Sequence, residues 1–401
     1  MNPKLIEEMG WRMGEVYAAV TDRILVNLAR HFPFIAQGEV PGSAWEYQVK
    51  KLAEMGQVTR ETAEIIFQSM KGGDEALRDV LEASIRDSLK DADKTLKEAA
   101  DRGLKYGAGF LPPELSPNQM QTFRAYYRQS ADKLNLVNTV MLESTQNVYQ
   151  RTVADIVERI NRIQGFLNKF AGEVITGVQT LNQAVRDAVQ KMVDTGITGY
   201  IDHGDHHWSP EAYVTMDIRT TAANTGRSAV FEQMEKYGTD LFWVSWHPGA
   251  RPLCYPWQGK VISKNGPHSQ STDLDGNTVE VYALSETTYG EPAGLFGINC
   301  GHYPNPFIPG LSKPRQPEQN EEENAKEYEE SQKQRELERN YRYAKRDLMV
   351  AKARGDEEEI AKAKKRVNLT RDNLNDFCKE TGRARRSSRE QTPIQAEWPE
   401  E

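Results

Sequence analysis

Cysteine is scarce in this sequence of 401 residues, which contains Cys254, Cys300 and Cys378. Three cysteines cannot supply the paired framework that stabilises small secreted domains, so we expect synthesis in a reducing compartment. The first residues, MNPKLIEEMGWRMGEVY, lack the basic segment and following apolar segment of a secretory signal. No apolar run reaches the roughly 18 residues that cross a bilayer. We therefore expect a soluble protein that is made in the cytoplasm and has no membrane partner.

Positive charge is also lacking, because the formal net charge is −8. This balance argues against a protein that coats nucleic acid with its whole surface. The sequence has no P-loop, no dinucleotide-binding glycine fingerprint and no GxSxG elbow, and we expect no small-molecule substrate. Its mean hydropathy of −0.71 is polar for a compact globule and indicates long solvated helices. The length suggests two or three domains.

Helical periodicity dominates residues 1–199. Apolar residues recur at intervals of three and four in the stripe Leu77, Leu81, Ile85, Leu89, Ala92 and Leu96. Prolines 112, 113 and 117 interrupt the pattern, and no further proline occurs before Pro210. These helices are too polar for a thick bundle, so we expect an extended arrangement or self-association that buries the stripes against other chains.

Residues 200–312 are rich in glycine, proline and aromatic residues. A helix is predicted from about Glu211 to Tyr237, with Gly238 ending it. The segment DLFWVSW then alternates, with Phe242 and Val244 on one face. The segments KVIS and TVEVYAL, separated by Asn-Gly and Asp-Gly turn signals, predict short strands in a hairpin-like arrangement. This region is predicted to be a small α+β domain.

Residues 313–382 are highly charged and predict a helical hairpin or coiled-coil segment, broken at Gly355-Asp356. Residues 383–401 have the composition of a disordered tail. That tail carries a basic cluster that could contact packaged DNA or remain solvated: Arg383, Arg385, Arg386 and Arg389. The predicted fold class is thus α+β, with a long, mainly helical first half, a small mixed domain and C-terminal helices.

One set of residues has the chemistry of a metal site, namely His247, Cys254, Cys300 and His302. Zinc favours tetrahedral sites of thiolate and imidazole, and a Cys2His2 set closes such a site. Gly301 would let the NCGH segment turn tightly. The spacing differs from the usual C-x2-C pattern. The alternative interpretation, two partly buried cysteines and two ordinary histidines around an aromatic core, therefore stays open.

Other clusters favour structural interpretations. The segment IDHGDHHWSP concentrates Asp202, His203, Asp205, His206 and His207, yet adjacent ligands in a glycine-containing loop are poorly organised for metal, and we predict a solvated loop. DLDGN resembles the start of a calcium loop but lacks the glutamate at its twelfth position, so we predict a turn. Arg251 is expected to anchor its own domain, and the polar face of RTTAANTGR is expected to pack on it.

The segments MDIRTTAANTG, YGTDLFWVSWHPGARPLCYPWQGKVIS and YGEPAGLFGINCGHYPNPFIPG together resemble the minor capsid protein 2 family of tailed bacteriophages. That family is similar to the Mu F-type head-morphogenesis proteins. The resemblance covers residues 195–312 most closely. Its motif positions fall on His247, Cys300 and His302 of the metal set and on Arg219, Asn224, Ser245, Arg251, Trp257, Gly259 and Asn299. Where Mu F-type proteins often have histidine and then cysteine, this sequence has Cys254 and His302, an exchange that keeps four ligands.

The resemblance implies a low-copy structural protein of the virion, close to the portal vertex, that assists head assembly or DNA packaging. It implies the portal protein, the major capsid protein or both as partners, with self-association, and no enzymatic activity. Structural zinc would be its cofactor, if it has one. The alternative function is a metal-dependent hydrolase that uses the His/Cys set. A DNA-binding module is a third possibility that the acidic balance disfavours.

Overall fold

The computed structural model describes residues 3–35, 43–102, 117–167, 182–183, 185–187, 190, 200–201 and 207–391. Two compact units share the chain. Unit 1 consists of residues 1–13, 72–133 and 214–332, and unit 2 consists of residues 14–71, 134–213 and 333–401. Each unit therefore groups segments that are far apart in the sequence. The domain boundaries after residues 199, 312 and 382 remain predictions.

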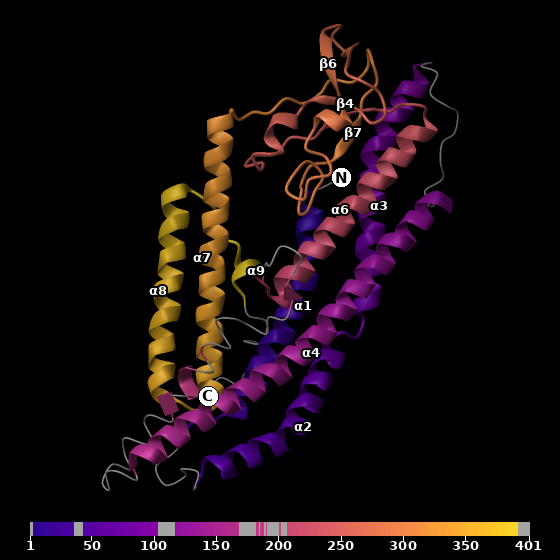
Figure 1. The fold of residues 1–401 in the computed structure, drawn as a ribbon. Helices are drawn as coiled ribbons and strands as arrows, with labels where there is room; N and C mark the ends of the chain where they lie inside the picture. The colour runs from indigo at the N-terminus through magenta and orange to yellow at the C-terminus, as the bar shows by residue number, and fades with distance from the viewer. Residues whose placement is uncertain are drawn as a thin grey trace. The chain divides into compact units, whose positions relative to one another are not determined.

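The first half of the described chain is built from long helices, as predicted (Figure 1). These are α1 (Pro3–Arg30), α2 (Ala44–Ser69), α3 (Gly73–Asp101) and α4 (Pro117–Leu167). The predicted stripe lies along α3, where Leu77, Leu81, Ile85 and Leu96 are fully buried. The polar composition thus reflects the solvated faces of long helices. No helix among the described residues is long and apolar enough to cross a membrane.

Short strands and one long helix form the middle of the chain. The pair β1 (Tyr200–Ile201) and β2 (His207–Trp208) precedes α6 (Pro210–Lys236), which ends before Gly238 at a φ of 73°. A five-stranded sheet follows in the order β5-β6-β4-β3-β7. Its strands are β3 (Leu241–Val244), β4 (Val261–Ser263), β5 (Ser269–Thr272), β6 (Thr278–Ala283) and β7 (Pro304–Pro306).

The pairing of the sheet corrects one expectation. The predicted strands KVIS and TVEVYAL are present as β4 and β6, but they pair in parallel instead of forming a hairpin. The hairpin partner of β6 is β5, which pairs antiparallel across the turn at Asp275-Gly276. Strand β5 is exposed and made of Ser, Gln and Thr, so it lacked the apolar alternation by which strands are recognised.

The sheet of unit 1 has two apolar faces, as the alternation in DLFWVSW predicts. Phe242 and Val244 pack with Val230 and Met234 of α6 on one face. On the other face, Leu241 and Trp243 pack with a second cluster made of Val261, Val281, Phe307 and Val279. Helix α6 thus covers the face that also holds Cys254 and Cys300.

The C-terminal part forms the predicted helical hairpin. Helices α7 (Glu321–Arg354) and α8 (Glu357–Thr381) run side by side in Figure 1. Gly355 reverses the chain at a φ of 69°, and the Asp356 side chain caps α8 by accepting a hydrogen bond from Glu359 N. The break that the sequence showed at Gly355-Asp356 is therefore the turn of the hairpin.

The beginning of the predicted disordered tail is ordered in the structure. Residues 387–390 form the short helix α9 (Ser387–Glu390). Arg385 pairs with Glu390, Arg383 donates to Gln334 Oε1 at 2.9 Å, and Arg389 lies 3.7 Å from Glu338. Ion pairs with α7 and within the turn hold this segment, which composition alone does not reveal. Residues 392–401 lie outside the described residues.

Candidate metal centre

Two segments of unit 1 bring two cysteines and a histidine together. Cys254 precedes the single helical turn η1 (Tyr255–Trp257), and Cys300 and His302 precede β7. Cys254 Sγ lies 3.9 Å from Cys300 Sγ, which lies 3.4 Å from His302 Nδ1. All three side chains are buried. The three therefore form a group that could hold a metal ion, and all belong to the set predicted from the sequence.

Arg227 of α6 holds the turn that carries Cys300 and His302. Its guanidinium donates to three main-chain carbonyls, those of Phe296 (3.1 Å), Cys300 (2.6 Å) and His302 (3.1 Å). It also donates to Asn224 Oδ1 at 2.8 Å. Arg227 is 3% exposed, and no carboxylate among the described residues pairs with it. A buried arginine thus fixes the main chain of the site.

The charge of Arg227 influences the two thiols. A hydrogen bond from Cys254 lowers the pKa of Cys300, and His302 and Arg227 lower it further. The same hydrogen bond to Cys300, together with burial, raises the pKa of Cys254. The arrangement favours one thiolate at Cys300, to which Phe296 N also donates at 3.2 Å. A thiolate is the form of cysteine that binds metal.

Gln258 sets the orientation of the His302 ring. Its Oε1 accepts the backbone N–H of His247 at 2.9 Å and lies 3.0 Å from His302 Nε2. Because a carboxamide oxygen accepts hydrogen bonds, Nε2 carries a ring proton, and Nδ1 is the ring nitrogen that faces Cys300. Metal-binding histidines usually have such a partner on their second nitrogen.

His247 lies beside the three-residue group without belonging to it. Its ring stacks on His302 with centroids 4.3 Å apart, and its Nδ1 donates to Pro248 O at 3.1 Å. Its Nε2 is buried and has no hydrogen-bond partner among the described residues. Burial lowers the pKa of His247 to about 4, so the ring is neutral and Nε2 has an unused lone pair. The fourth predicted ligand is therefore adjacent to the group and chemically competent.

The same two cysteines also pack in the aromatic core. The alternative interpretation, in which they are ordinary core residues, therefore agrees with the structure as well. Cys254 and Cys300 cluster with Phe242, Phe296 and the partly buried Trp257. Trp257 makes an edge contact with Tyr282 at 5.7 Å. The site is therefore part of the core of unit 1, closed off from solvent.

The remaining motif residues stabilise the fold around this site. Ser245 links β3 to β7 through Tyr303: Ser245 N donates to Tyr303 O, and Tyr303 N donates to Ser245 Oγ. The carbonyl of Arg251 accepts from Cys254 N and Tyr255 N, which anchors that turn. Asn299 has a φ of 56° and donates from its backbone to Thr220 Oγ1.

Two further motif residues, Arg219 and Gly259, take part in close contacts that involve a glycine. A Cβ at Gly10 would lie 2.1 Å from Cγ of Arg219, so the arginine stem packs directly on α1. Gly259 has a φ of 71°, and a Cβ there would lie 2.9 Å from Arg315 O. Both positions therefore require glycine for close approach.

The other predicted clusters divide between a turn and an undescribed segment. Asp273 Oδ1 accepts from the backbone of Asp275 and Asn277, so DLDGN is the predicted turn. Asp202, His203, Asp205 and His206 lie outside the described residues, and His207 begins β2.

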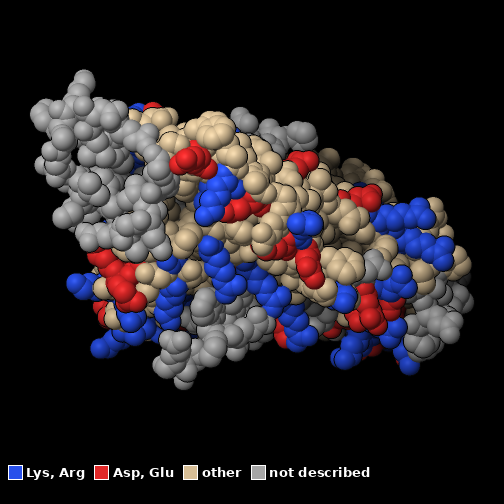
Figure 2. Space-filling view, turned by 90° about the horizontal axis from the view of Figure 1, so that it is seen from below, with Lys and Arg blue, Asp and Glu red and all other residues tan. Residues whose placement is uncertain are grey.

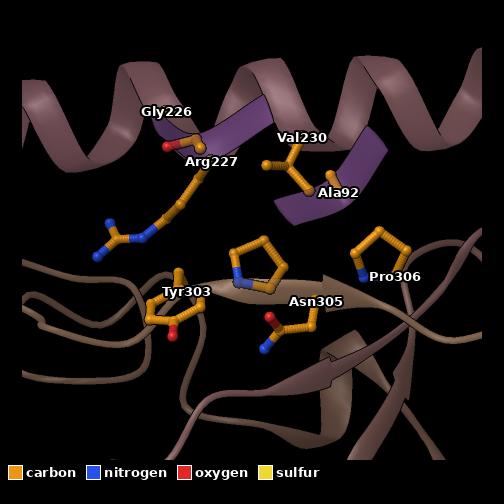
Figure 3. A pocket seen from close by; sticks show the side chains of 9 residues that line it. Ala92, Gly226, Arg227, Val230, Tyr303, Asn305 and Pro306 are labelled. Atoms are coloured by element: carbon orange, nitrogen blue, oxygen red, sulfur yellow. The ribbon is translucent and has the colours of Figure 1, made fainter. Parts of the chain in front are cut away.

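A cavity between α6 and β7 measures about 10 Å³ (Figure 3). The figure shows Gly226, Arg227 and Val230 of α6 on one side and Tyr303 and Asn305 on the other. A space of this size holds about one water molecule. It is far smaller than the several hundred Å³ typical of a substrate pocket.

The comparisons with known proteins agree with the sequence resemblance. The family model for phage minor capsid protein 2 matches residues 1–379. The chain belongs to this family. A structural protein of Lactococcus phage LL-H is 29% identical over 301 residues, which cover 74% of this chain and 75% of that protein. No solved structure matches the chain significantly. The family and this relative support a structural role, and neither supports the alternative of a metal-dependent hydrolase.

The sequence predicted that the polar face carrying Arg227 packs on the small domain, and Arg227 does contact residues 296, 300 and 302 there. Its role in holding the main chain of the site was not predicted, and Gln258 was not singled out. The signal for Arg227 was available in the surrounding small residues, AANTGRSAV, because a long cation among small side chains on a buried helix needs internal partners. No comparable signal exists for Gln258.

Proposed function

We propose that this chain is a low-copy structural protein of the phage head near the portal vertex, where it assists head assembly or DNA packaging. The portal protein, the major capsid protein or both would be its partners. The family match supports the virion location, and the burial of the candidate site supports a structural role. Cys254, Cys300 and His302 have almost no contact with solvent, so a substrate could not reach them without opening the core.

Surface charge supports protein partners over a DNA coat. On the face shown in Figure 2, Asp and Glu side chains lie among the Lys and Arg side chains, and the formal net charge of the whole chain is −8. DNA-binding surfaces concentrate positive charge. Contact of the basic tail with packaged DNA remains a narrower proposal, since Arg383, Arg385 and Arg389 already have partners in unit 2.

Cross-linking of assembled particles, followed by mass spectrometry, tests the placement. We expect cross-links from this chain to the portal protein or to the capsid subunits around one vertex. A reconstruction of the particle without imposed icosahedral symmetry should show its density there. Cross-links spread evenly over the capsid lattice would contradict the vertex assignment.

We further propose that the candidate metal centre binds one structural zinc ion. With bonds of about 2.0–2.3 Å, the ligand atoms of tetrahedral zinc lie roughly 3.5–3.8 Å apart. The observed separations of 3.9 Å and 3.4 Å lie just above and just below this range, so small shifts of the side chains would bring the atoms to bonding positions. The orientation of His302 also fits such a group, and the unused Nε2 of His247 lies beside it. Zinc would connect the two loops and stiffen unit 1.

Metal analysis of the full chain, purified under reducing conditions, tests the zinc proposal. We expect about one zinc per chain, lost in Cys254→Ser and Cys300→Ser. Cys378→Ser is the matched control, because Cys378 is a buried cysteine of α8 and its variant should retain zinc. His247→Ala reports whether His247 completes the site. A zinc-free wild-type chain would leave the aromatic-core interpretation.

A further inference from the structure

Helix α2 exposes an apolar stripe that nothing in the metal centre or its surroundings uses. The most exposed members are Trp45 (69%), Phe67 (65%), Val49 (47%) and Leu52 (44%). Gly56 and Ala63, which are also exposed, lie between them on the same helical face. We call these six residues the α2 stripe. The opposite face of α2 is buried, with Tyr47, Val58, Thr62 and Ile66 inside unit 2.

An exposed stripe of this kind is unusual for a surface helix. Surface helices normally have one apolar face, which points to the core, and a polar face toward solvent. Aromatic side chains offer about 150–250 Å² each, so the two rings alone expose roughly 200–300 Å². With the aliphatic residues, the exposed apolar area of the α2 stripe approaches that of patches that mark interaction sites, although it is spread along the helix with Arg60 lying between its members.

The outer residues of the α2 stripe are placed symmetrically about Gly56. Trp45 and Phe67 lie eleven residues before and after Gly56, and Val49 and Ala63 lie seven residues before and after it. Eleven and seven residues are about three and two helical turns, so all five positions face the same side. The stripe therefore has a large ring at each end and a small residue at its centre. Four residues from Gly56 the two halves differ, because the counterpart of Leu52 is the exposed Arg60.

Such a surface is complementary to an antiparallel copy of itself. A two-fold axis at Gly56 would place Trp45 of one copy on Phe67 of the other, which is the isologous contact that two-fold dimers use. Gly56 permits a close crossing of the helices, because nothing lies within 4 Å of the position of an added Cβ.

Charge along one edge of the α2 stripe agrees with this orientation. Lys50 and Glu64 are exposed and lie on the same edge, six residues before and eight residues after Gly56. In the antiparallel pair, Glu64 of one copy comes within about two residues' rise, or ~3 Å along the helix axis, of Lys50 of the other. In a parallel pair these two charges would lie at opposite ends of the interface.

We propose that the α2 stripe is the contact between two copies of this chain, paired antiparallel about a two-fold axis at Gly56. This names the surface for the self-association expected from the helical stripes. It depends neither on zinc nor on placement at the portal vertex, so it can fail while the proposed function holds.

The first test measures the mass of the full-length chain by light scattering and sedimentation across a dilution series. We expect a dimer that dissociates on dilution. The double variant Trp45→Glu/Phe67→Glu should raise the dissociation constant at least 30-fold. Leu369→Glu is the matched control, because Leu369 is 61% exposed on α8 and lies outside the stripe. A wild-type chain that stays monomeric, or a double variant that still dimerises, would overturn the proposal.

A second variant separates loss of the contact from loss of folding. Gly56→Leu places a better helix former at an open position, so the thermal midpoint of the chain should not fall. The same leucine would obstruct the helix crossing and raise the dissociation constant at least tenfold. Unchanged dimerisation in this variant would show that α2 helices do not cross at Gly56.

Disulfide trapping tests the orientation. Chains carrying Lys50→Cys and chains carrying Glu64→Cys are mixed and exposed to oxidised glutathione. We expect crossed dimers, which join one chain of each variant, to form faster than dimers of either variant with itself. A predominance of dimers between two Lys50→Cys chains would indicate parallel pairing and overturn the two-fold axis at Gly56. The absence of trapping in all mixtures would overturn the interface.

Discussion

Each unit contains a buried arginine, and the two arginines have different kinds of partners. Arg227 in unit 1 donates to three main-chain carbonyls and an asparagine. Arg346 in unit 2 instead contacts two carboxylates, Asp22 at 2.6 Å and Glu211 at 2.8 Å. Arg346 thus belongs to a charge-compensated network, whereas the charge of Arg227 is left to act on the neighbouring thiols. An arginine without a carboxylate partner among the described residues favours a thiolate at Cys300 in unit 1, whereas the charge of Arg346 is balanced within unit 2.

Removal of metal should separate the two units most strongly. If zinc joins the loops of unit 1, a chelator removes several kcal/mol of stabilisation, since structural zinc contributes about 10 kcal/mol or more in small domains. Hydrogen exchange should then accelerate in residues 241–312. The hairpin of α7 and α8, which contains none of the proposed ligands, should keep its protection. Equal acceleration in both regions would mean that the chelator acts globally.

Replacing either buried arginine should strongly destabilise the fold. Further substitutions should restore the stability lost with Arg346 but not the stability lost with Arg227. Arg346→Met removes the cation that contacts two buried carboxylates and should cost about 3–5 kcal/mol. Adding Asp22→Asn and Glu211→Gln removes those charges and should restore much of the stability.

Arg227→Met should cost a similar amount, because three buried carbonyls lose their donor at about 1–3 kcal/mol each. Further side-chain substitutions cannot restore this stability, because the groups that lose their donor are main-chain carbonyls. Urea unfolding of the single and combined variants measures both effects. Recovery of Arg227→Met through Asn224→Leu would contradict the dominant role given to the carbonyls.

The sequence was sufficient for the parts of the fold that follow from local rules. Periodicity located the buried stripe of α3, alternation identified β3, and Gly355-Asp356 marked the hairpin turn. The parallel pairing of β4 with β6 could not be read in this way, because pairing joins residues that local patterns treat independently. The polar strand β5 gave no signal at all.

The sequence predicted which residues form the candidate site, but it did not predict how they are arranged in space. Zinc chemistry identified the right residue types, and the structure brings Cys254, Cys300 and His302 together. That His247 stacks on His302 depends on the course of two loops. That Arg227 holds three carbonyls depends on how α6 crosses the sheet. The order of residues 383–391 similarly depends on ion pairs with α7, which lies some fifty residues earlier in the chain.

Two glycines of similar conformation should show how tightly each region is packed. Gly259 and Gly355 have φ values of 71° and 69°. Gly355→Ala meets open space and should cost about 1–2 kcal/mol, the cost of a left-handed backbone for alanine. Gly259→Ala adds a clash with Arg315 O and should cost roughly 1–3 kcal/mol more. Thermal or urea unfolding of the two variants measures the difference. Equal costs would indicate that the main chain near Arg315 yields easily.

The smallest expected effect is the pH dependence that Asp356, at the cap of α8, contributes to stability. Burial raises the pKa of Asp356, but hydrogen bonds from Arg186 and from Glu359 N, with the charges of Arg186 and Arg354, outweigh it and leave the pKa lowered. A lowered folded-state pKa means that the ionised carboxylate stabilises the fold above the ordinary aspartate pKa. That contribution is lost as the pH falls through the folded-state pKa.

Asp356→Asn is the natural comparison, since asparagine also caps helices but does not titrate in this range. At pH 5–6 the wild-type chain should unfold at a higher temperature than Asp356→Asn, because its carboxylate pairs with Arg186 at 2.8 Å. The difference should shrink as the pH is lowered below about 4, where aspartate begins to take up protons. Far-UV circular dichroism melts at several pH values measure it. A difference that stays constant down to pH 2 would show that the cap, and not the ion pair, accounts for the role of Asp356.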